Sequence, residues 1–232
     1  MTIDLNGQRV LVVGAGGGIG RATADAFKAA GAHVVATGRN AAKLDGAGTE
    51  QASLDFLDND AVEAFFAGMA PFDHVVVAAA TTKSGPVGGL ALDAAQASME
   101  SKFWGAYRIA RAAKINEGGS LTFVSGFLSN RPSPTSVLQG AINAAIEALA
   151  RGLALETAPV RVNTVSPGLI DTPLWAAMAE ADRHGMFERT AAKLPARRVG
   201  QPEDIAQAIL FVATNPFATG STVTVDGGGT IA

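Results

Sequence analysis

The sequence predicts an α/β fold of the doubly wound class, a three-layer sandwich in which helices cover both faces of a seven-stranded parallel sheet. Short β-branched runs alternate with alanine-rich helical stretches along the chain, and this alternation is typical of right-handed β–α–β crossovers. The run Val75–Ala79 is almost continuously apolar, as expected of a strand buried on both faces. No repeat or linker interrupts the pattern, so residues 1–232 are expected to form a single domain.

The first part of the chain is expected to contain four strands and two helices. The helix Ile19–Ala30 stops at Gly31, a common helix terminator. A second helix, Asp58–Met69, begins at a capping aspartate and carries Val62, Phe65 and Phe66 on one face. The expected strands of this part are Arg9–Val13, His33–Thr37, Gln51–Leu54 and Val75–Ala79.

The rest of the chain is expected to add three strands and three helices. Two long helices span about Asp93–Asn116 and Ser136–Thr157, and a third, Pro202–Ala213, precedes the last strand. A less regular, charged stretch, Leu169–Gly200, follows Pro167-Gly168. The expected strands here are Ser120–Ser125, Val160–Val165 and Thr222–Val225.

Composition excludes several classes of function. The chain has 232 residues with 48% hydrophobic and 17% charged residues, which argues against disorder. It has no cysteine, and therefore no disulfide, thiolate metal site or cysteine nucleophile. Its net charge of −3 gives no basic surface for nucleic acid. Met1-Thr2-Ile3-Asp4 does not resemble a signal peptide and no apolar run suits a membrane helix, so a cytoplasmic protein without membrane contact is expected.

A glycine-rich loop lies between the first strand and the first helix. This placement is typical of a Rossmann-type dinucleotide site, because glycines allow a tight turn and the helix N-terminus receives the pyrophosphate. A purely structural turn can require the same residue type. The residues expected to bind the cofactor here are Gly14, Gly16, Gly17, Gly18, Ile19 and Gly20.

The end of the second strand favours NADP(H) over NAD(H). A carboxylate at this place binds the free ribose 2′-hydroxyl of NAD, but the sequence has Arg39-Asn40 there. The planar fork of Arg39 suits a 2′-phosphate. The alternative is an ordinary solvated surface arginine.

Several motifs resemble those of the short-chain dehydrogenase/reductase family over nearly the whole chain. Gly14, Gly18 and Gly20 have that family's glycine spacing, and Leu54-Asp55-Phe56 resembles its adenine-contacting segment. Arg161 to Gly168 with Thr172-Pro173, Gly200 to Ala206, and Thr219 to Gly228 resemble its later signatures. The resemblance adds further cofactor-binding residues: Asp55, Phe56, Ala78, Ala79, Ala80, Pro167, Gly168, Ile170 and Thr172. It also implies a substrate-covering segment at about 169–200, and a homotetramer or homodimer through the two long helices.

The four catalytic positions depart from the pattern that the resemblance implies. Members of the family have a Tyr-x-x-x-Lys pair on the second long helix, a serine after the fifth strand and an asparagine on the first long helix. Aligning Ala144–Leu149 with the residues that usually follow this pair places Gln139 at the tyrosine position and Asn143 at the lysine position. Counting back to the fifth strand places Gly126 at the serine position, with Ser125 one residue earlier, and Lys102 stands at the asparagine position. The candidate catalytic residues are therefore Lys102, Ser125, Gln139 and Asn143.

Glutamine has no titratable group, so Gln139 can orient a carbonyl but cannot act as a general acid. The only tyrosine, Tyr107, lies with Phe103 and Trp104 in an apolar series that predicts core or subunit contact. Asparagine and lysine have exchanged places, which suggests that Lys102 supplies the positive charge of the cavity from the other helix. The alternative is that Lys102 merely covers a helix face.

Other proton donors have weaker support. His184 lies in the presumed covering segment and titrates in the useful range, whereas His33 and His74 stand at strand entries, away from the ligand-binding edge. No cluster has metal-ligand spacing. The sequence therefore predicts an NADP(H)-dependent oxidoreductase of a small carbonyl or alcohol with an atypical active site. The alternatives are an inactive NADP(H)-binding sensor or assembly protein, and a structural homologue with neither property.

Overall fold

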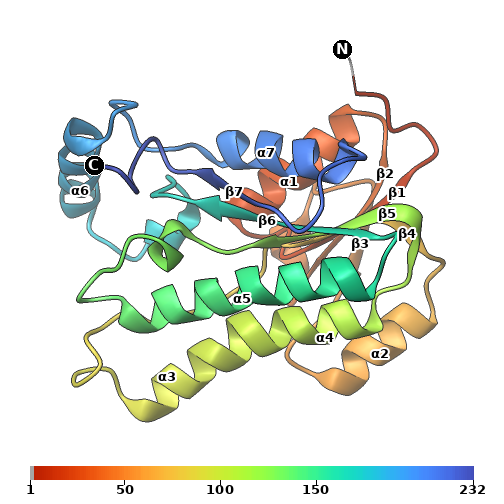
Figure 1. Ribbon diagram of the computed structural model, residues 1–232, viewed down its shortest axis with the longest axis horizontal. Helices are drawn as coiled ribbons and strands as arrows, with labels where there is room; N and C mark the ends of the chain where they lie inside the picture. The colour runs from red at the N-terminus through yellow and green to blue at the C-terminus, as the bar shows by residue number, and fades with distance from the viewer. Residues whose placement is uncertain (1–2) are drawn as a thin grey trace.

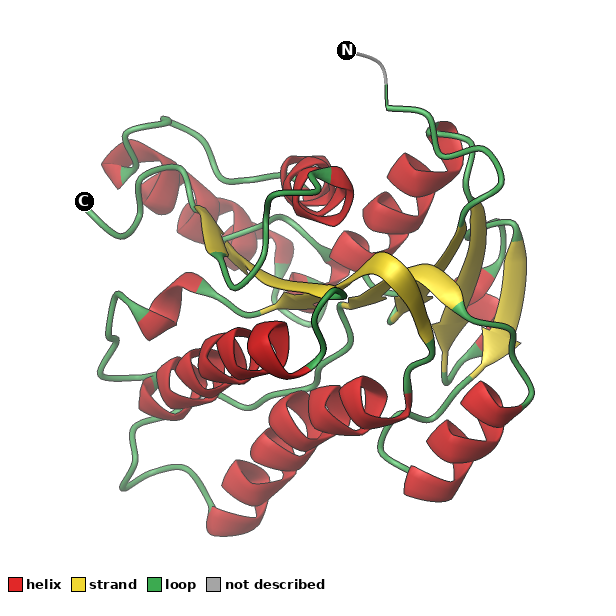
Figure 2. Ribbon diagram, turned by 45° about the vertical axis from the view of Figure 1, so that its right-hand side comes forward, coloured by secondary structure: helices red, strands yellow, loops and turns green. Residues whose placement is uncertain are grey.

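The computed structural model describes residues 3–232. Met1 and Thr2, which belong to the segment compared above with a signal peptide, lie outside the described residues. Residues 3–232 form a parallel seven-stranded sheet in the order β3-β2-β1-β4-β5-β6-β7, which confirms the predicted fold class. Helices cover both faces of the sheet (Figure 2). The strands are β1 (Arg9–Val13), β2 (His33–Gly38), β3 (Glu50–Ser53), β4 (Phe72–Val77), β5 (Ile115–Val124), β6 (Arg161–Pro167) and β7 (Thr222–Val225).

The helices divide between the two faces. Figure 1 shows α1 and α7 on one side of the sheet and α2, α4 and α5 on the other. Asp58 caps α2 as predicted, because its carboxylate accepts hydrogen bonds from the amides of Asp60 and Ala61 at 2.9 and 3.1 Å. The helix bounds are α1 (Gly18–Ala29), α2 (Asn59–Ala67), α3 (Leu92–Met99), α4 (Gly105–Ala112), α5 (Val137–Glu156), α6 (Glu180–Lys193) and α7 (Pro202–Thr214).

Strand β1 shows why the central strands are apolar throughout. Successive side chains of a strand point to opposite faces, so Val10 and Val12 join one core with Phe27 of α1. Leu11 and Val13 join the other core with residues of α2, α4 and α5. Each such side chain contributes about 1.5–3 kcal/mol on burial, and the two cores together fix the three layers.

The first long helix was predicted over about Asp93–Asn116, and its C-terminal bound is wrong. It consists of α3, a π-helical turn Glu100–Trp104, and α4, and it ends at Ala112. Gly105, which follows the π-helical turn, packs against Phe56, where a Cβ atom would lie 2.4 Å from a ring carbon. The chain leaves the helix early because the Phe72 amide donates to the carbonyl of Lys114 at 2.9 Å. Strands β4 and β5 therefore both begin earlier than predicted.

The segment 169–200 is more regular than predicted. It contains a 3₁₀ turn, Pro173–Trp175, and the 14-residue helix α6. Glu180 and Asp182 in the first turn of α6 and Lys193 in its last turn suit the helix dipole. No residue of α6 is buried, so the sequence lacks the apolar periodicity that would have revealed the helix.

The strand order places a ligand crevice between β1 and β4. Connections leave β1 toward β2 and β4 toward β5, in opposite directions along the sheet. Ligands of such sheets bind outside the carboxyl ends of the strands at this reversal. The glycine loop after β1 and Ala78 after β4 both lie there, since the amide of Ala78 donates to the carbonyl of Val13 at 2.9 Å.

Candidate active site

A cleft of about 500 Å³ opens at the carboxyl ends of β1, β4, β5 and β6. A smaller pocket of about 280 Å³ adjoins it beyond the glycine loop. Of the residues predicted to bind the cofactor, the cleft is lined by Gly16, Gly17, Gly18, Ile19, Gly20, Ala78, Ala79, Ala80, Pro167, Gly168, Ile170 and Thr172. The smaller pocket adds Gly14, Arg39, Asn40 and Phe56. Asp55 lines neither, and its exposed carboxylate accepts the amide of Leu57 at 3.1 Å.

The glycine loop brings the start of α1 to the wall of the cleft. At Gly20 a Cβ atom would lie 2.1 Å from the carbonyl oxygen of Gly14, so only glycine allows this tight turn. Gly17 stands at the N-cap without a side-chain hydrogen bond, and the first turn of α1 has no acidic residue. The first amides of α1 therefore lack side-chain partners and suit an anionic group.

The smaller pocket carries two cations. Arg39 is exposed at the end of β2, and Lys43 lines both the pocket and the cleft. The loop is held in place by Arg21 of α1, which donates to the carbonyls of Lys43 and Asp45 at 3.1 and 2.7 Å. Asn40 accepts the amide of Ala42 at 3.0 Å. Among the described residues, no carboxylate lines this pocket. The sequence interpretation missed Lys43, although it lies four residues after Arg39.

The opposite end of the cleft holds a polar cluster centred on Lys102. This lysine lies in the π-helical turn, and its ammonium donates to the carbonyl of Ser125 at 2.7 Å and to Asn143 Oδ1 at 2.6 Å. Lys102, Ser125, Gln139 and Asn143 all line the cleft. The structure therefore brings together the four candidate catalytic residues from three separate elements.

Gly126 and Asn143 are fitted to each other. A Cβ atom at Gly126 would lie 2.7 Å from Asn143 Nδ2, closer than packed atoms normally approach. A serine at this position would displace the Asn143 amide, and with it an acceptor of the Lys102 ammonium. Gly126 and the hydrogen bond between Lys102 and Asn143 are thus structurally linked.

A buried carboxylate completes the cluster. Glu147 lies one helical turn after Asn143 on α5 and is only 6% exposed. Its Oε1 atom accepts the hydroxyls of Ser125 at 2.8 Å and Ser129 at 2.7 Å. The sequence interpretation missed Glu147, although the spacing of four residues from Gln139 to Asn143 to Glu147 marks one face of a helix.

Burial lowers the pKa of the Lys102 ammonium to about 8, and the negative charge of Glu147 opposes this shift. A low-dielectric site disfavours the charged amine, whereas a nearby carboxylate stabilises it. Lys102 is consequently the group of the cleft that can bind and release a proton close to neutral pH.

Gln139 is fixed by the loop that follows β4. It is 8% exposed, and its amide nitrogen donates to the carbonyl of Lys83 and, at 3.1 Å, to the hydroxyl of Ser84. The same loop is anchored to α3 and the π-helical turn, because Ser98 and Ser101 accept the amides of Lys83 and Thr81 at 2.9 and 2.8 Å. Gln139 therefore holds the wall of the cleft in place.

His184 and Tyr107 lie outside the cleft lining. His184 is on α6, not in a loop, with its side chain 74% exposed and 3.1 Å from Glu188, so it is not a proton donor in this arrangement. Tyr107 is 42% exposed and packs edge-on against Trp104. The expectation that Tyr107 belongs to the core is wrong, and subunit contact is the alternative that stays open.

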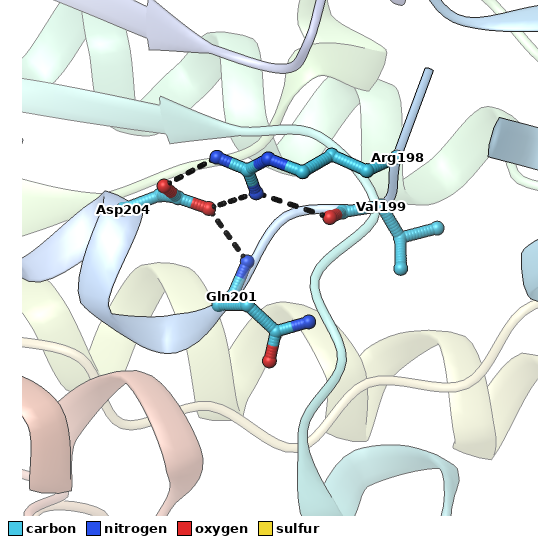
Figure 3. Close-up of polar contacts among 4 residues, drawn as sticks. All are labelled: Arg198, Val199, Gln201 and Asp204. Carbon is cyan, nitrogen blue, oxygen red and sulfur yellow. Dashed lines mark hydrogen bonds and ion pairs between the residues drawn. The ribbon is translucent and has the colours of Figure 1, made fainter. Parts of the chain in front are cut away.

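The segment 169–200 is anchored near its C-terminal end by an ion pair. Arg198 donates to both carboxylate oxygens of Asp204 at 2.6 and 2.7 Å, and Asp204 also accepts the amide of Gln201 at 2.7 Å (Figure 3). Gly200 pairs with Ile170 in a short bridge. These contacts tie the end of the segment to the start of α7 and to the wall of the cleft.

Two negative findings concern residues 3–232 only. No group of three or more His, Asp or Glu side chains there is arranged to hold a metal ion. No helix in the same range has the length and apolar character needed to cross a membrane.

Comparison with known proteins identifies the family. Residues 14–230 match the family model described as enoyl-(acyl carrier protein) reductase, a short-chain dehydrogenase model. Mouse L-xylulose reductase is 32% identical, with 98% of each chain covered. Chicken D-erythrulose reductase is 31% identical, with 97% of each chain covered. The chain belongs to the short-chain dehydrogenase/reductase family.

The crystal structure of a protein described as a small-chain dehydrogenase in complex with NADPH superposes with a TM-score of 0.87 and 34% identity, over 99% of this chain and 100% of that one. Short-chain dehydrogenases are nicotinamide-dependent oxidoreductases, and the site described above fits such a cofactor. The N-terminus of α1, which no side chain caps, can receive a pyrophosphate. The cleft and its adjoining pocket form one trough from Arg39 to Lys102, because they share Gly16, Gly17, Lys43 and Ala78–Ala80.

Proposed function

We propose that this short-chain dehydrogenase is an NADP(H)-dependent oxidoreductase that interconverts a small carbonyl compound and its alcohol, with Lys102 in place of the usual proton carrier. The observation that carries the proposal is the Lys102 cluster at one end of a trough whose other end holds Arg39 and Lys43. The residues between these ends are those expected to bind a dinucleotide.

The cofactor preference rests on charge. Arg39 and Lys43 lie on the pocket at the end of β2, where among the described residues no carboxylate competes with a phosphate. Guanidinium and ammonium groups bind phosphate by charge-assisted hydrogen bonds. A 2′-phosphate therefore fits here better than a free 2′-hydroxyl, which supports NADP(H).

The bound cofactor supplies the hydride in the reduction direction. Lys102 donates two hydrogen bonds, to Ser125 and Asn143, and an ammonium has three N–H groups. The third N–H is available to a substrate oxygen in the cleft. Because its pKa is about 8, Lys102 can give a proton to a developing alkoxide and take one back in the reverse direction. Asn143 and the Ser125 carbonyl hold the ammonium in position.

The substrate proposed is a small polar carbonyl compound of the ketose type. The relatives named L-xylulose reductase and D-erythrulose reductase support this choice. The cleft supports it too, because its volume of about 500 Å³ must also accept part of the cofactor.

The main alternative is a non-catalytic NADP(H)-binding sensor or assembly protein. One observation favours it: Gln139 cannot titrate, and its amide nitrogen already serves Lys83 and Ser84. Such a protein would bind NADPH without turnover. A homologue with neither property would not bind NADPH at all.

We also propose a homodimer or homotetramer formed through α4 and α5. Trp104 and Tyr107 are 45% and 42% exposed on the outer face of the first long helix, and exposed clustered aromatic side chains are typical of interfaces. Light scattering of the purified protein distinguishes these assemblies from a monomer.

The experiment that tests the function titrates the protein with NADPH and NADH and then assays a panel of ketoses. We expect tighter binding of NADPH, together with oxidation of NADPH by at least one ketose. In Arg39→Ala the preference for NADPH should fall by about tenfold, which corresponds to the loss of one charge-assisted hydrogen bond. Lys28→Ala, an exposed cation on α1 outside both pockets, is the matched control. Equal affinity for NADH and NADPH in the wild type would contradict the cofactor assignment.

A further inference from the structure

A further cavity lies beside the cleft, under α6. It has a volume of about 280 Å³ and is bounded by α6, the turn after β5 and the segment that follows β7. Figure 1 shows α6 and the C-terminal end of the chain at the same edge of the molecule. The residues lining this outer pocket are Phe127, Arg131, Leu169, Met186, Arg189, Thr190, Lys193, Leu194, Asp226, Gly229 and Ala232.

Three cations line the outer pocket. Arg131, Arg189 and Lys193 are all exposed. Within residues 3–232, none of the three forms an ion pair with an Asp or Glu side chain. Arg131 donates one hydrogen bond, to the main-chain oxygen of Ala232 at 3.0 Å. Most of the donor capacity of these side chains is therefore available to a ligand.

The single acidic residue of the outer pocket does not neutralise these cations. Asp226 uses one carboxylate oxygen to accept the amide of Gly228 at 2.9 Å and the other to accept the amide of Thr230 at 2.7 Å. It thus orders the turn after β7. Three cations face this occupied carboxylate and the terminal carboxyl of Ala232, so the pocket keeps an excess of one positive charge, in a chain whose net charge is −3.

The arrangement on α6 is regular. Met186, Arg189 and Lys193 are spaced at three and four residues and so lie on one face of the helix. Leu169 and Leu194 add apolar surface to the same pocket. An anionic group with a short carbon chain would satisfy both the charges and the apolar lining.

The outer pocket adjoins the proposed reaction site. Phe127 lines both cavities, and Leu169 of the outer pocket stands between Gly168 and Ile170 of the cleft. A substrate of a few carbon atoms can therefore place its carbonyl in the cleft and its far end in the outer pocket.

We propose that the outer pocket binds the anionic end of the substrate, a phosphate or carboxylate group, through Arg131, Arg189 and Lys193. This inference rests on the proposed function, because it assigns the substrate class of the same site: phosphorylated or carboxylated ketoses rather than neutral ones. The guanidinium forks of Arg131 and Arg189 match the planar geometry of two acceptor oxygens.

The test measures binding by calorimetry, with saturating NADP⁺ and without it, so that no turnover is needed. The probes are xylulose and xylulose 5-phosphate, which differ only in the phosphate, and sorbose and 5-ketogluconate, which compare a neutral and a carboxylated six-carbon ketose. We expect at least one anionic probe to bind about tenfold or more tightly than its neutral partner, as expected for charged hydrogen bonds. The two pairs distinguish a phosphate from a carboxylate site.

The double variant Arg189→Gln with Lys193→Gln should abolish this difference between anionic and neutral probes. Lys28→Gln, which removes a cation outside the pocket, should keep it. Equal binding of neutral and anionic probes, or an undiminished preference in the double variant, would overturn the proposal. A parallel NADPH titration separates the two claims. Absent NADPH binding with a retained anion preference contradicts the proposed function and supports the pocket.

Discussion

Among single residues, Lys102 has a side chain whose position is fixed by two hydrogen bonds of its ammonium group. Its Cα lies on the first long helix, yet its ammonium reaches the carbonyl after β5 and the amide on α5, at 2.7 and 2.6 Å. A side chain that merely covered a helix face would remain solvated. Lys102 thus brings a cation into the cleft from the first long helix.

Replacing Lys102 by methionine keeps the length of the side chain and removes its charge and its proton. At saturating NADPH and ketose, kcat of Lys102→Met should fall by about 10²- to 10⁴-fold, the usual contribution of a positioned general acid. Steady-state kinetics measures this loss. Lys28→Met should retain wild-type kcat, and a Lys102→Met variant with full activity would show that another group carries the proton.

Glu147 acts on Lys102 through charge. Its carboxylate raises the pKa of the ammonium, which burial has lowered to about 8. In Glu147→Gln the pKa should therefore fall further. In the proposed reduction the protonated amine is the acid, so the rate should decline as pH rises through this pKa, and the decline should occur at lower pH in the variant.

The pH profile of kcat/KM for reduction measures this shift. Ser129→Ala is the matched control, because it removes one hydrogen bond to Glu147 Oε1 and leaves the carboxylate in place. Its profile should follow that of the wild type. Coincident profiles of Glu147→Gln and wild type would assign Glu147 a purely structural role.

At the scale of elements, sequence patterns succeeded where burial is periodic. The strands β1 and β7 have the predicted bounds, and α5 and α7 differ from prediction by a residue at each end or less. Helix α6 was missed because none of its residues is buried. The early start of β5 was missed because its pairing with β4 depends on contacts between Phe72 and Lys114 that are distant in sequence.

The candidate site shows the same division. The glycine loop and Arg39 follow from their places beside β1 and β2, since a topology dictates what lies at its strand ends. The sequence did not predict Lys43, Glu147 or the outer pocket, because each depends on how a loop or helix is oriented in three dimensions. The linkage of Gly126 with Asn143 likewise appears only as a distance of 2.7 Å.

The start of α7 depends on Asp204. Its carboxylate accepts the Gln201 amide at the N-cap and binds Arg198 (Figure 3), and these contacts lower its pKa to about 2. Loss of such a cap costs about 1 kcal/mol. Asp204→Ala should therefore lower the free energy of unfolding in urea by about this amount, whereas Glu203→Ala, an exposed first-turn neighbour, should lower it by a few tenths of a kcal/mol. Equal effects of the two substitutions would show that the cap contributes nothing specific.

At the scale of the whole molecule, the stability of the fold depends on pH through His74, which lies at the end of the sheet opposite the cleft. It is 5% exposed on β4, with its ring nitrogens 2.8 Å from the Ser120 hydroxyl and 2.9 Å from Gln8 Oε1. Burial, and next the charge of Arg161, lower the pKa of His74 from 6.5 to about 4. The folded protein therefore holds this imidazole neutral over a range in which the unfolded chain protonates it.

The sign of the pH effect follows from this difference. Because the folded pKa lies below the unfolded one, the stabilisation is complete above pH 6.5 and is lost as pH falls toward 4. A shift of this size corresponds to about 3 kcal/mol. Urea unfolding between pH 7 and 4 should show this decline in the wild type and a shallower one in His74→Gln. His33→Gln, which alters an exposed histidine paired with Glu50, should retain the slope. If His74→Gln retained it as well, the acid sensitivity of the fold would have to arise from other groups.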